Sequence, residues 1–278
     1  MSKNNLATVF IWLIALLVSG VFFWLLSDII VHGLAKLSWP FLVENPKNAG
    51  RSGGIGPIIV STALILMVAM ITATPLGLAT AVLLSEFTQQ DRVFGHLVRR
   101  SLDVLAGVPS IVFGLFGNAF FCIYLGLGFS ILSGGLTLAC MVLPILIRTV
   151  EEGLQATPNE YRLAAAALGM SRGAALFQVL LPAATPAIVA GLLLGIGRAG
   201  AETAALIFTS GYVDRMPGSL FDSGRALSVH IYDLSMNVAG GDASAFSSAL
   251  VLIMLLVIIN SLAMSLAKHW QHKSIIAL

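Results

Sequence analysis

Long apolar runs constrain this sequence of 278 residues more than any other feature. After Lys3 the chain stays apolar as far as Ser27, which is longer than the apolar core of a secretory signal peptide and matches a membrane-spanning helix. Hydrophobic residues make up 58% of the chain and charged residues only 10%, which is too little polar surface to cover a soluble globule of this size. We therefore expect an all-α membrane protein surrounded by lipid, and the net charge of +2 gives no reason to expect a nucleic-acid partner.

Six apolar stretches are long enough to be membrane spans. They are Leu6–Ser27, Ile58–Leu84, Val104–Leu125, Ile131–Ile147, Ile188–Phe208 and Phe246–Ala267. The connection 211–245 between the last two contains GRALSVHIYDLSMN, which fits either a short interfacial helix or an extended gate. We expect a first span with its external connection in residues 1–54 and one membrane domain in residues 55–278.

The distribution of Lys and Arg predicts the orientation, because cytoplasmic loops of membrane proteins accumulate these residues. If the N-terminus is inside, nine of them are cytoplasmic: Lys3, Arg92, Arg99, Arg100, Arg148, Arg162, Arg172, Lys268 and Lys273. Five are then external: Lys36, Lys47, Arg51, Arg215 and Arg225. The bias predicts that both termini are cytoplasmic.

One segment, TPNEYRLAAAALGMSRGAALFQVLLPAATP at Thr157–Pro186, interrupts the apolar pattern. Thr157 is expected to be the N-cap of a helix, with Pro158 at the first helical position. Glu160, three residues after the cap, would complete a capping box, and the helix should end at Leu168. The segment therefore begins as a helix that lies on the cytoplasmic side.

A turn and a second helix should follow. Gly169 is placed where a helix end favours a left-handed residue, and Ser171 can cap a helix that continues to Pro182. Two helices joined by a tight turn form the hairpin 157–182. The small side chains of Ala164–Ala167 would let another surface approach closely.

Apolar residues on this hairpin need a cover. Leu163, Leu168 and Met170 would be exposed unless another surface buried them. From physical reasoning alone, that surface is either a partner protein or the underside of the chain's own transmembrane bundle.

The spacing within the hairpin resembles the EAA loop of ABC importer permeases. The matching positions are Ala164, Ala165, Gly169, Val179, Leu181 and Pro182. In that family the loop docks into a groove on a cytoplasmic ATPase, which implies a coupling role for Leu163, Ala164, Ala165, Leu168, Gly169, Met170 and Pro182. Leu163 stands where the motif usually has glutamate, so the polar contact of that glutamate is not carried over.

Three further stretches narrow the resemblance. They are LAGVPSIVFGLFG at Leu105–Gly117, PILIRTVEEGLQATPNEYR at Pro144–Arg162 and GIGRAGAETAALIFTSG at Gly195–Gly211. Together they resemble the permease subunit, PstA type, of the phosphate-specific ABC importer, and the likeness runs from about Ile55 onward. It implies six transmembrane helices with the type I ABC importer (MetI-like) fold, in a bacterial inner membrane.

The resemblance also implies an assembly. Its members would be a second permease (PstC-like), two ATPases (PstB-like), an external phosphate-binding protein (PstS-like) and phosphate itself. This sequence has no Gly-Lys dipeptide and so no phosphate-cradling P-loop, which leaves ATP and Mg to the separate ATPase subunits. We expect a subunit that is not an enzyme and has no cofactor of its own.

Arg198 and Glu202 are charged residues inside the fifth expected span. A guanidinium there costs about 2.5–3.5 kcal/mol on insertion scales, so a partner is expected, and Glu202 lies one helical turn later with Thr203 beside it. The pair is either a buried structural ion pair or part of the substrate path. The resemblance favours the path, because both positions match an RxxGET stretch of the family, and arginine suits phosphate through its fixed fork of donors.

Two more residues are candidates for the path. Arg148, at the cytoplasmic end of the fourth span, either contacts the leaving substrate or extends to the interface as an ordinary flanking arginine. Ser110 follows Pro109 and either offers a hydroxyl to the substrate or only marks a helix kink. Glu151 and Glu152 are interpreted as a solvated entry to the hairpin. The five histidines lack the spacing of metal ligands, so no metal is expected.

Two other functions fit part of the pattern. A permease for another oxyanion, sulfate or molybdate, would use the same machine. An ion-coupled secondary carrier would use Arg198 and Glu202 as a proton relay. An intramembrane hydrolase is not supported, because no Ser–His–Asp set can be placed on facing helices from the sequence.

Overall fold

Helices make up almost all of the structure, a computed structural model that describes residues 3–88 and 93–276. The described part also contains one antiparallel pair of short strands, β1 (Pro46–Lys47) and β2 (Ser52–Gly53). The longer helices are α1 (Lys3–Gly33), α3 (Gly56–Val82), α4 (Val93–Ala106), α6 (Ile131–Ala156), α10 (Thr185–Gly200) and α13 (Asp242–Ile276). The shorter elements are α2 (Trp39–Val43), η1 (Asn48–Gly50), η2 (Leu83–Phe87), α5 (Ser110–Gly117), η3 (Asn118–Tyr124), α7 (Asn159–Ala167), α8 (Arg172–Ala175), η4 (Leu176–Leu180), α9 (Leu181–Ala183), α11 (Ala204–Ile207) and α12 (Leu227–Met236).

Four helices in the described part are long and apolar enough to cross a membrane by themselves, namely Thr8–Gly33, Gly56–Phe87, Ile131–Ala156 and Asp242–Ser265. Two bent pairs, Val93–Ala106 with Ser110–Tyr124 and Arg172–Ala183 with Thr185–Gly200, raise the number to six if each pair is one span. The all-α membrane fold predicted from the sequence is confirmed.

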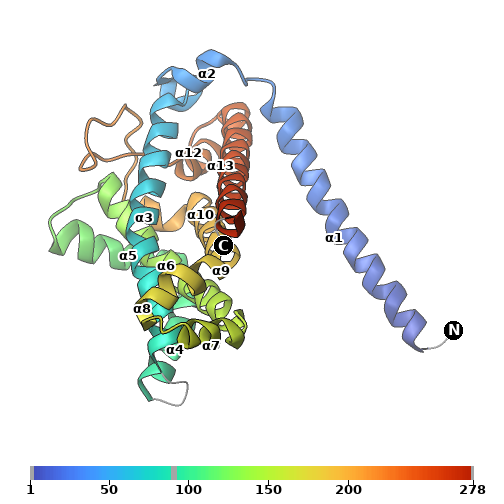
Figure 1. The fold of residues 1–278 in the computed structure, drawn as a ribbon. Coiled ribbons are helices and arrows are strands. Elements are labelled where there is room, and N and C mark those ends of the chain that lie inside the picture. Colours follow the sequence, from blue (N-terminus) through green and yellow to red (C-terminus); the bar gives the residue numbers. More distant parts are fainter. Residues whose placement is uncertain (1–2, 89–92, 277–278) are drawn as a thin grey trace.

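The third expected span, Val104–Leu125, contains a sharp break near its start. α4 and the following helix α5–η3 meet at an angle of 100°. The break falls at Gly107–Pro109, where proline cannot donate to the helix ladder and disfavours the helical conformation of Val108 before it. α4 therefore lies at the hairpin end of the molecule and turns away from α5, which begins at Ser110 (Figure 1).

The fifth expected span, Ile188–Phe208, is displaced toward the N-terminus. α10 begins at Thr185 and ends at Gly200, and it is bent by 66° from the helix that precedes it. Ala201–Thr203 then interrupt the helix before the single turn of α11. The interruption separates the two charged residues that the sequence placed on one helical face.

The core of the bundle is the packing of α3, α6 and α10. Small residues allow this contact: Gly77 on α3 lies against Leu146, and Gly195 on α10 lies against Val142. Leu146 and Val142 are themselves completely buried on α6. These three packed helices position the hairpin, which connects α6 to α10, and the charged residues near the end of α10.

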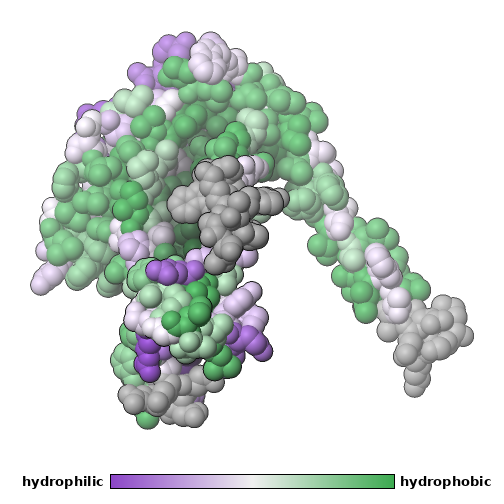
Figure 2. Space-filling view, viewed as in Figure 1, coloured by the Kyte–Doolittle hydropathy of each residue, from purple (hydrophilic) through white to green (hydrophobic). Residues whose placement is uncertain are grey.

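α1 stands apart from the bundle. Figure 1 shows it leaning away from α13, so that the two approach only near the end that carries α2. There Gly33 lies against Leu250, and the Ser247 hydroxyl donates to the Gly33 carbonyl at 2.8 Å. The N-terminal end of α1 points the same way as the hairpin. Figure 2 shows apolar residues over much of α1, while hydrophilic residues gather at the α2 end and the hairpin end.

The connection 211–245 is partly helical, which decides the alternative left open by the sequence. α12 occupies Leu227–Met236, and the loop before it is held by Arg225, which contacts Asp233 at 3.2 Å and donates to the Tyr212 carbonyl at 2.8 Å. Burial and the charge of Arg225 lower the pKa of His230 to about 4, against a weaker opposing effect of Asp233. His230 is therefore neutral at neutral pH.

Some of the Lys and Arg residues used to predict the orientation lie outside the described part of the chain. This applies to Arg92 and to the side chains of Lys3, Lys268 and Lys273.

Candidate functional site

The hairpin 157–182 has the predicted helix–turn–helix shape. α7 ends at Ala167 with Leu168 as its C-cap, and Gly169 follows with a φ of +68°, in the left-handed region. The Met170 N–H donates to the Ala165 carbonyl and the Gly169 N–H to the Ala166 carbonyl, both at 3.0 Å, which is the Schellman ending of a helix. The Ser171 hydroxyl accepts from the Ala174 N–H at 3.2 Å and so caps α8, as expected.

The predicted start of the hairpin is wrong by one residue. Thr157 ends α6, and its hydroxyl donates back to the Gly153 carbonyl at 3.2 Å instead of capping α7. Pro158 takes the cap position, where its side chain has no oxygen to offer. The capping box with Glu160 does not form, because α6 runs nearly ten residues further than the expected fourth span and uses Thr157 for its own end.

We expect Gly169→Ala to loosen the turn of the hairpin. A left-handed alanine costs about 1–2 kcal/mol, and Gly169 needs this conformation although the space around it is open. Amide hydrogen exchange of Ala164–Met170 should become faster. Gly173→Ala is the matched control, because Gly173 lies in α8 with open space around it and an ordinary helical backbone. Equal effects of the two substitutions would contradict the strain argument.

Apolar side chains project from the hairpin without cover from the rest of the chain. Leu168 is 80% exposed and Leu163 is 63% exposed, while Met170 is half-buried. Among the small residues only Ala165 is buried, and Ala164, Ala166 and Ala167 remain open. Pro182 and Gly169 are exposed as well. Of the two covers considered for these residues, the chain's own bundle does not bury Leu163 or Leu168.

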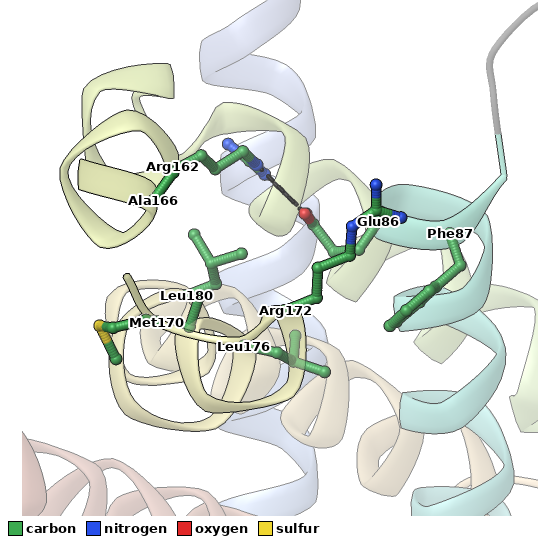
Figure 3. Close-up of a pocket in the computed structure, with 9 residues that line it drawn as sticks. Glu86, Phe87, Arg162, Ala166, Met170, Arg172, Leu176 and Leu180 are labelled. Carbon is green, nitrogen blue, oxygen red and sulfur yellow. Dashed lines mark hydrogen bonds and ion pairs between the residues drawn. The ribbon is translucent and has the colours of Figure 1, made fainter. Parts of the chain in front are cut away.

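Arg162 anchors the hairpin to the end of α3. Its guanidinium donates to both carboxylate oxygens of Glu86, at 2.6 and 3.1 Å, and Figure 3 shows the side chain reaching toward Glu86. It also donates to the carbonyls of Leu154 and Thr157, each at 2.9 Å. Hydrogen bonding to Glu86 raises the pKa of Arg162 and outweighs its partial burial, so the group stays charged.

A second arginine holds the same end of α3 from α4. Arg99 donates to the Leu84 carbonyl at 3.0 Å and to Glu151 Oε1 at 2.6 Å. Glu151 is 1% exposed, so its interpretation as a solvated residue is wrong, whereas Glu152 is exposed. The helical turn that points Glu152 outward points Glu151 into the contact between α6 and α4.

Arg198 and Glu202 do not pair. Among the ion pairs of the described residues none joins them, because α10 ends between them. Glu202 instead accepts from the Ala205 N–H at 3.2 Å, at the start of α11, and Thr203 is half-buried beside it. Arg198 lies exposed in the last turn of α10. Its guanidinium is thus open to whatever lies outside this chain.

The other two path candidates are Ser110, directly after the break between α4 and α5, and Arg148, on α6 and in contact with α4. Arg148 is half-buried and bonds Asp103 of α4 at 2.9 Å, so it fastens α6 to α4. Ser110 is half-buried at the first position of α5, directly after Pro109. Its location fits the helix-kink interpretation at least as well as a contact with substrate.

Sequence reasoning missed Glu86 and Arg99 as functional candidates, and treated Arg162 only as a charge on the hairpin. The sequence did contain a signal for these two residues. Glu86 is an acidic residue immediately after an apolar span, and Arg99 is a basic residue on the next helix. Their pairing could not be read from the sequence, since the partners are 76 and 52 residues apart. Within the described residues, no three His, Cys, Asp or Glu side chains are grouped so as to hold a metal.

Comparison with protein families gives a match over most of the chain. Residues 73–274 match the family described as "Binding-protein-dependent transport system inner membrane component". This range includes the hairpin, its anchors Glu86 and Arg162, and the charged residues Arg198 and Glu202.

Individual relatives and solved structures agree with this match. A probable ABC transporter permease protein, YqgI of Bacillus subtilis, is 30% identical over 96% of this chain and 94% of its own length. The phosphate transport system permease protein PstA of Mycobacterium leprae is 34% identical over 93% of this chain and 86% of its own. The MetNI methionine ABC transporter in an inward-facing conformation resembles the fold, with a TM-score of 0.59 and 18% identity over 78% of this chain and 94% of that one.

Proposed function

Because the chain belongs to the family of binding-protein-dependent transport system inner membrane components, we propose that it is the PstA-type permease subunit of an ATP-driven phosphate importer. The observation that carries the proposal is the likeness to phosphate permeases over more than nine-tenths of the chain. It favours phosphate over sulfate or molybdate, and the family favours an ABC permease over an ion-coupled carrier. Catalysis of ATP hydrolysis belongs to other subunits.

The family implies an ATPase and an external binding protein as partners. In our proposal these are two PstB-like ATPases, which bind ATP and Mg, and a PstS-like phosphate-binding protein. A PstC-like permease supplies the other half of the path in a bacterial inner membrane, with both termini of this chain in the cytoplasm. The uncovered Leu163 and Leu168 support the hairpin as the ATPase contact, since a lone apolar patch at the polar end of a membrane protein needs a partner.

The path in this proposal runs past Arg198, with Glu202, Thr203, Arg148 and Ser110 as further contributors. Support comes from the exposure of Arg198, which has no ion-pair partner within the described chain. An arginine inside a spanning region is costly unless it meets water, a partner or an anion. The facing permease and the passing phosphate would supply that contact.

The class of machine is tested by purifying the tagged chain from membranes with its assembled partners. We expect an ATPase and a second permease in the eluate, and phosphate uptake into vesicles that requires both ATP and the binding protein. A chain that purifies alone and still drives uptake from a proton gradient would overturn the proposal in favour of the carrier.

Arg198→Ala should reduce phosphate uptake by the assembled transporter about 10- to 100-fold, the value of a hydrogen bond to a charged group. Phosphate uptake by Arg198→Lys should lie between that of Arg198→Ala and that of the wild type, because lysine keeps the charge but not the fork of donors. Arg100→Ala is the control, since Arg100 is exposed on α4 and makes no ion pair within the described residues. Unchanged uptake in Arg198→Ala would remove this residue from the path.

A further inference from the structure

The hairpin end of α3 is gripped by two arginines that come from different helices. η2, the wide helical turn Leu83–Phe87 that ends α3, receives Arg99 at the Leu84 carbonyl and Arg162 at the Glu86 carboxylate. Arg99 belongs to α4 and is fixed in place by Glu151 of α6. Arg162 belongs to α7, inside the hairpin. The end of α3 is therefore tied on one side to the bundle and on the other side to the hairpin.

Chain connectivity makes the second tie important. The hairpin continues directly from α6 and leads directly into α10, but it does not adjoin α3 along the chain. Movement of the hairpin can reach α6 and α10 through the backbone. To reach α3, which forms the core of the bundle with α6, it must pass through contacts between side chains.

The contact between Arg162 and Glu86 has the strength that such a role requires. It is a two-point charge-assisted pair, with side chains 28% and 14% exposed, so water screens it only in part. The same guanidinium holds the Leu154 and Thr157 carbonyls at the end of α6. One side chain thus joins the end of α3, the end of α6 and the first helix of the hairpin.

A pocket open to solvent lies beside this contact. It measures about 250 Å³ and lies between η2, α7 and the second helix of the hairpin. Figure 3 shows Phe87, Met170, Leu176 and Leu180 around it, with Arg162 and Glu86 at its edge. At the edge of this pocket, the hydrogen-bonded ion pair of Arg162 with Glu86 joins the hairpin to η2.

We propose that Arg162 and Glu86 form the joint through which movement of the ATPase-bound hairpin is passed to α3. The inference rests on the proposed function and adds to it a pair of positioning residues that touch neither substrate nor ATP. When the joint is intact, a shift of the hairpin carries α3 with it. When the joint is broken, the hairpin still docks and ATP is still hydrolysed, and α6 and α10 still feel its movement through the backbone, but α3 no longer follows.

The test uses the complete transporter in proteoliposomes with its loaded binding protein. For Glu86→Gln and Arg162→Gln we expect normal assembly, retained ATP hydrolysis, and at least about a tenfold fall in phosphate moved per ATP, within the range of known coupling effects. Arg162→Lys should fall between these variants and the wild type, because a single ammonium cannot hold a carboxylate at two points and two carbonyls together. Arg100→Gln is the matched control and should transport normally.

A second readout does not depend on the substrate. In the wild-type complex, trapping with ATP and vanadate should change amide hydrogen exchange at Leu83–Phe87, and the change should be absent in Glu86→Gln. An unchanged transport ratio together with an unchanged exchange response would overturn the joint. So would loss of the ATPase from both glutamine variants, because the pair would then hold the shape of the hairpin. If the wild type moves no phosphate, the proposed function fails, while the exchange response still tests the joint.

Discussion

Replacement of both Leu163 and Leu168 by aspartate should abolish co-purification of the ATPase with this chain. These are the most exposed large apolar side chains on α7 and its cap, and burying a leucine side chain contributes about 1.5–3 kcal/mol. Loss of both, with two charges placed in the contact, should weaken association at least about 100-fold. ATP-driven uptake should disappear with it.

The matched control is Met216→Asp. Met216 is also an exposed apolar residue, but it lies in the connection 211–245, far along the chain from the hairpin. The double hairpin variant and the control should have the same thermal unfolding midpoint in detergent, because none of the three side chains belongs to the core. An ATPase that stays bound to the double variant would show that the hairpin is not its contact surface.

Glu151→Ala should destabilise the protein by about 3–5 kcal/mol, which is the usual cost of leaving one member of a buried ion pair without its partner. Glu151 is 1% exposed, and Arg99, whose side chain is 16% exposed, would lose its carboxylate and keep the bond to the Leu84 carbonyl. The unfolding midpoint of the detergent-solubilised chain should fall accordingly. Destabilisation should be largest at the contact of α4 with α6.

The neighbouring residue provides an unusually close control. Glu152→Ala removes the same carboxylate from the same helical turn, but Glu152 is exposed, so its loss should change stability by no more than about 0.5 kcal/mol. The double variant Arg99→Met, Glu151→Leu should recover much of the stability, because apolar replacement of a buried pair is often neutral. If both single variants lose equal stability, the buried pair is not the cause.

The sequence predicts this fold well wherever local rules decide the outcome. Apolar length identifies the regions that cross the membrane, and the Gly169–Ser171 turn forms as its glycine and serine predict. The break at Pro109 is visible in the sequence as well, but its angle is not, because apolar residues on both sides give a single continuous hydropathy signal. The interruption after Gly200 is hidden for the same reason.

Contacts between distant residues explain the remaining differences. Glu151 and Glu152 have the same chemistry and adjacent positions, and only the packing of α4 against α6 decides which one is buried. Likewise, Glu202 satisfies the nearby Ala205 N–H once the helix has ended, so the expected pair with Arg198 has no geometric basis. Helical periodicity predicts neighbours only as long as the helix continues.

The isolated position of α1 has a consequence for how this chain can vary. Between Thr8 and Leu26 the helix makes so little contact with this chain's own bundle that the bundle requires no particular shape of side chain there. The close approach at Gly33 is different, since a Cβ atom there would come within 2.9 Å of Leu250. Within this chain, the first part of α1 is therefore constrained only by hydrophobicity and length, and Gly33 sets the place where α1 meets α13.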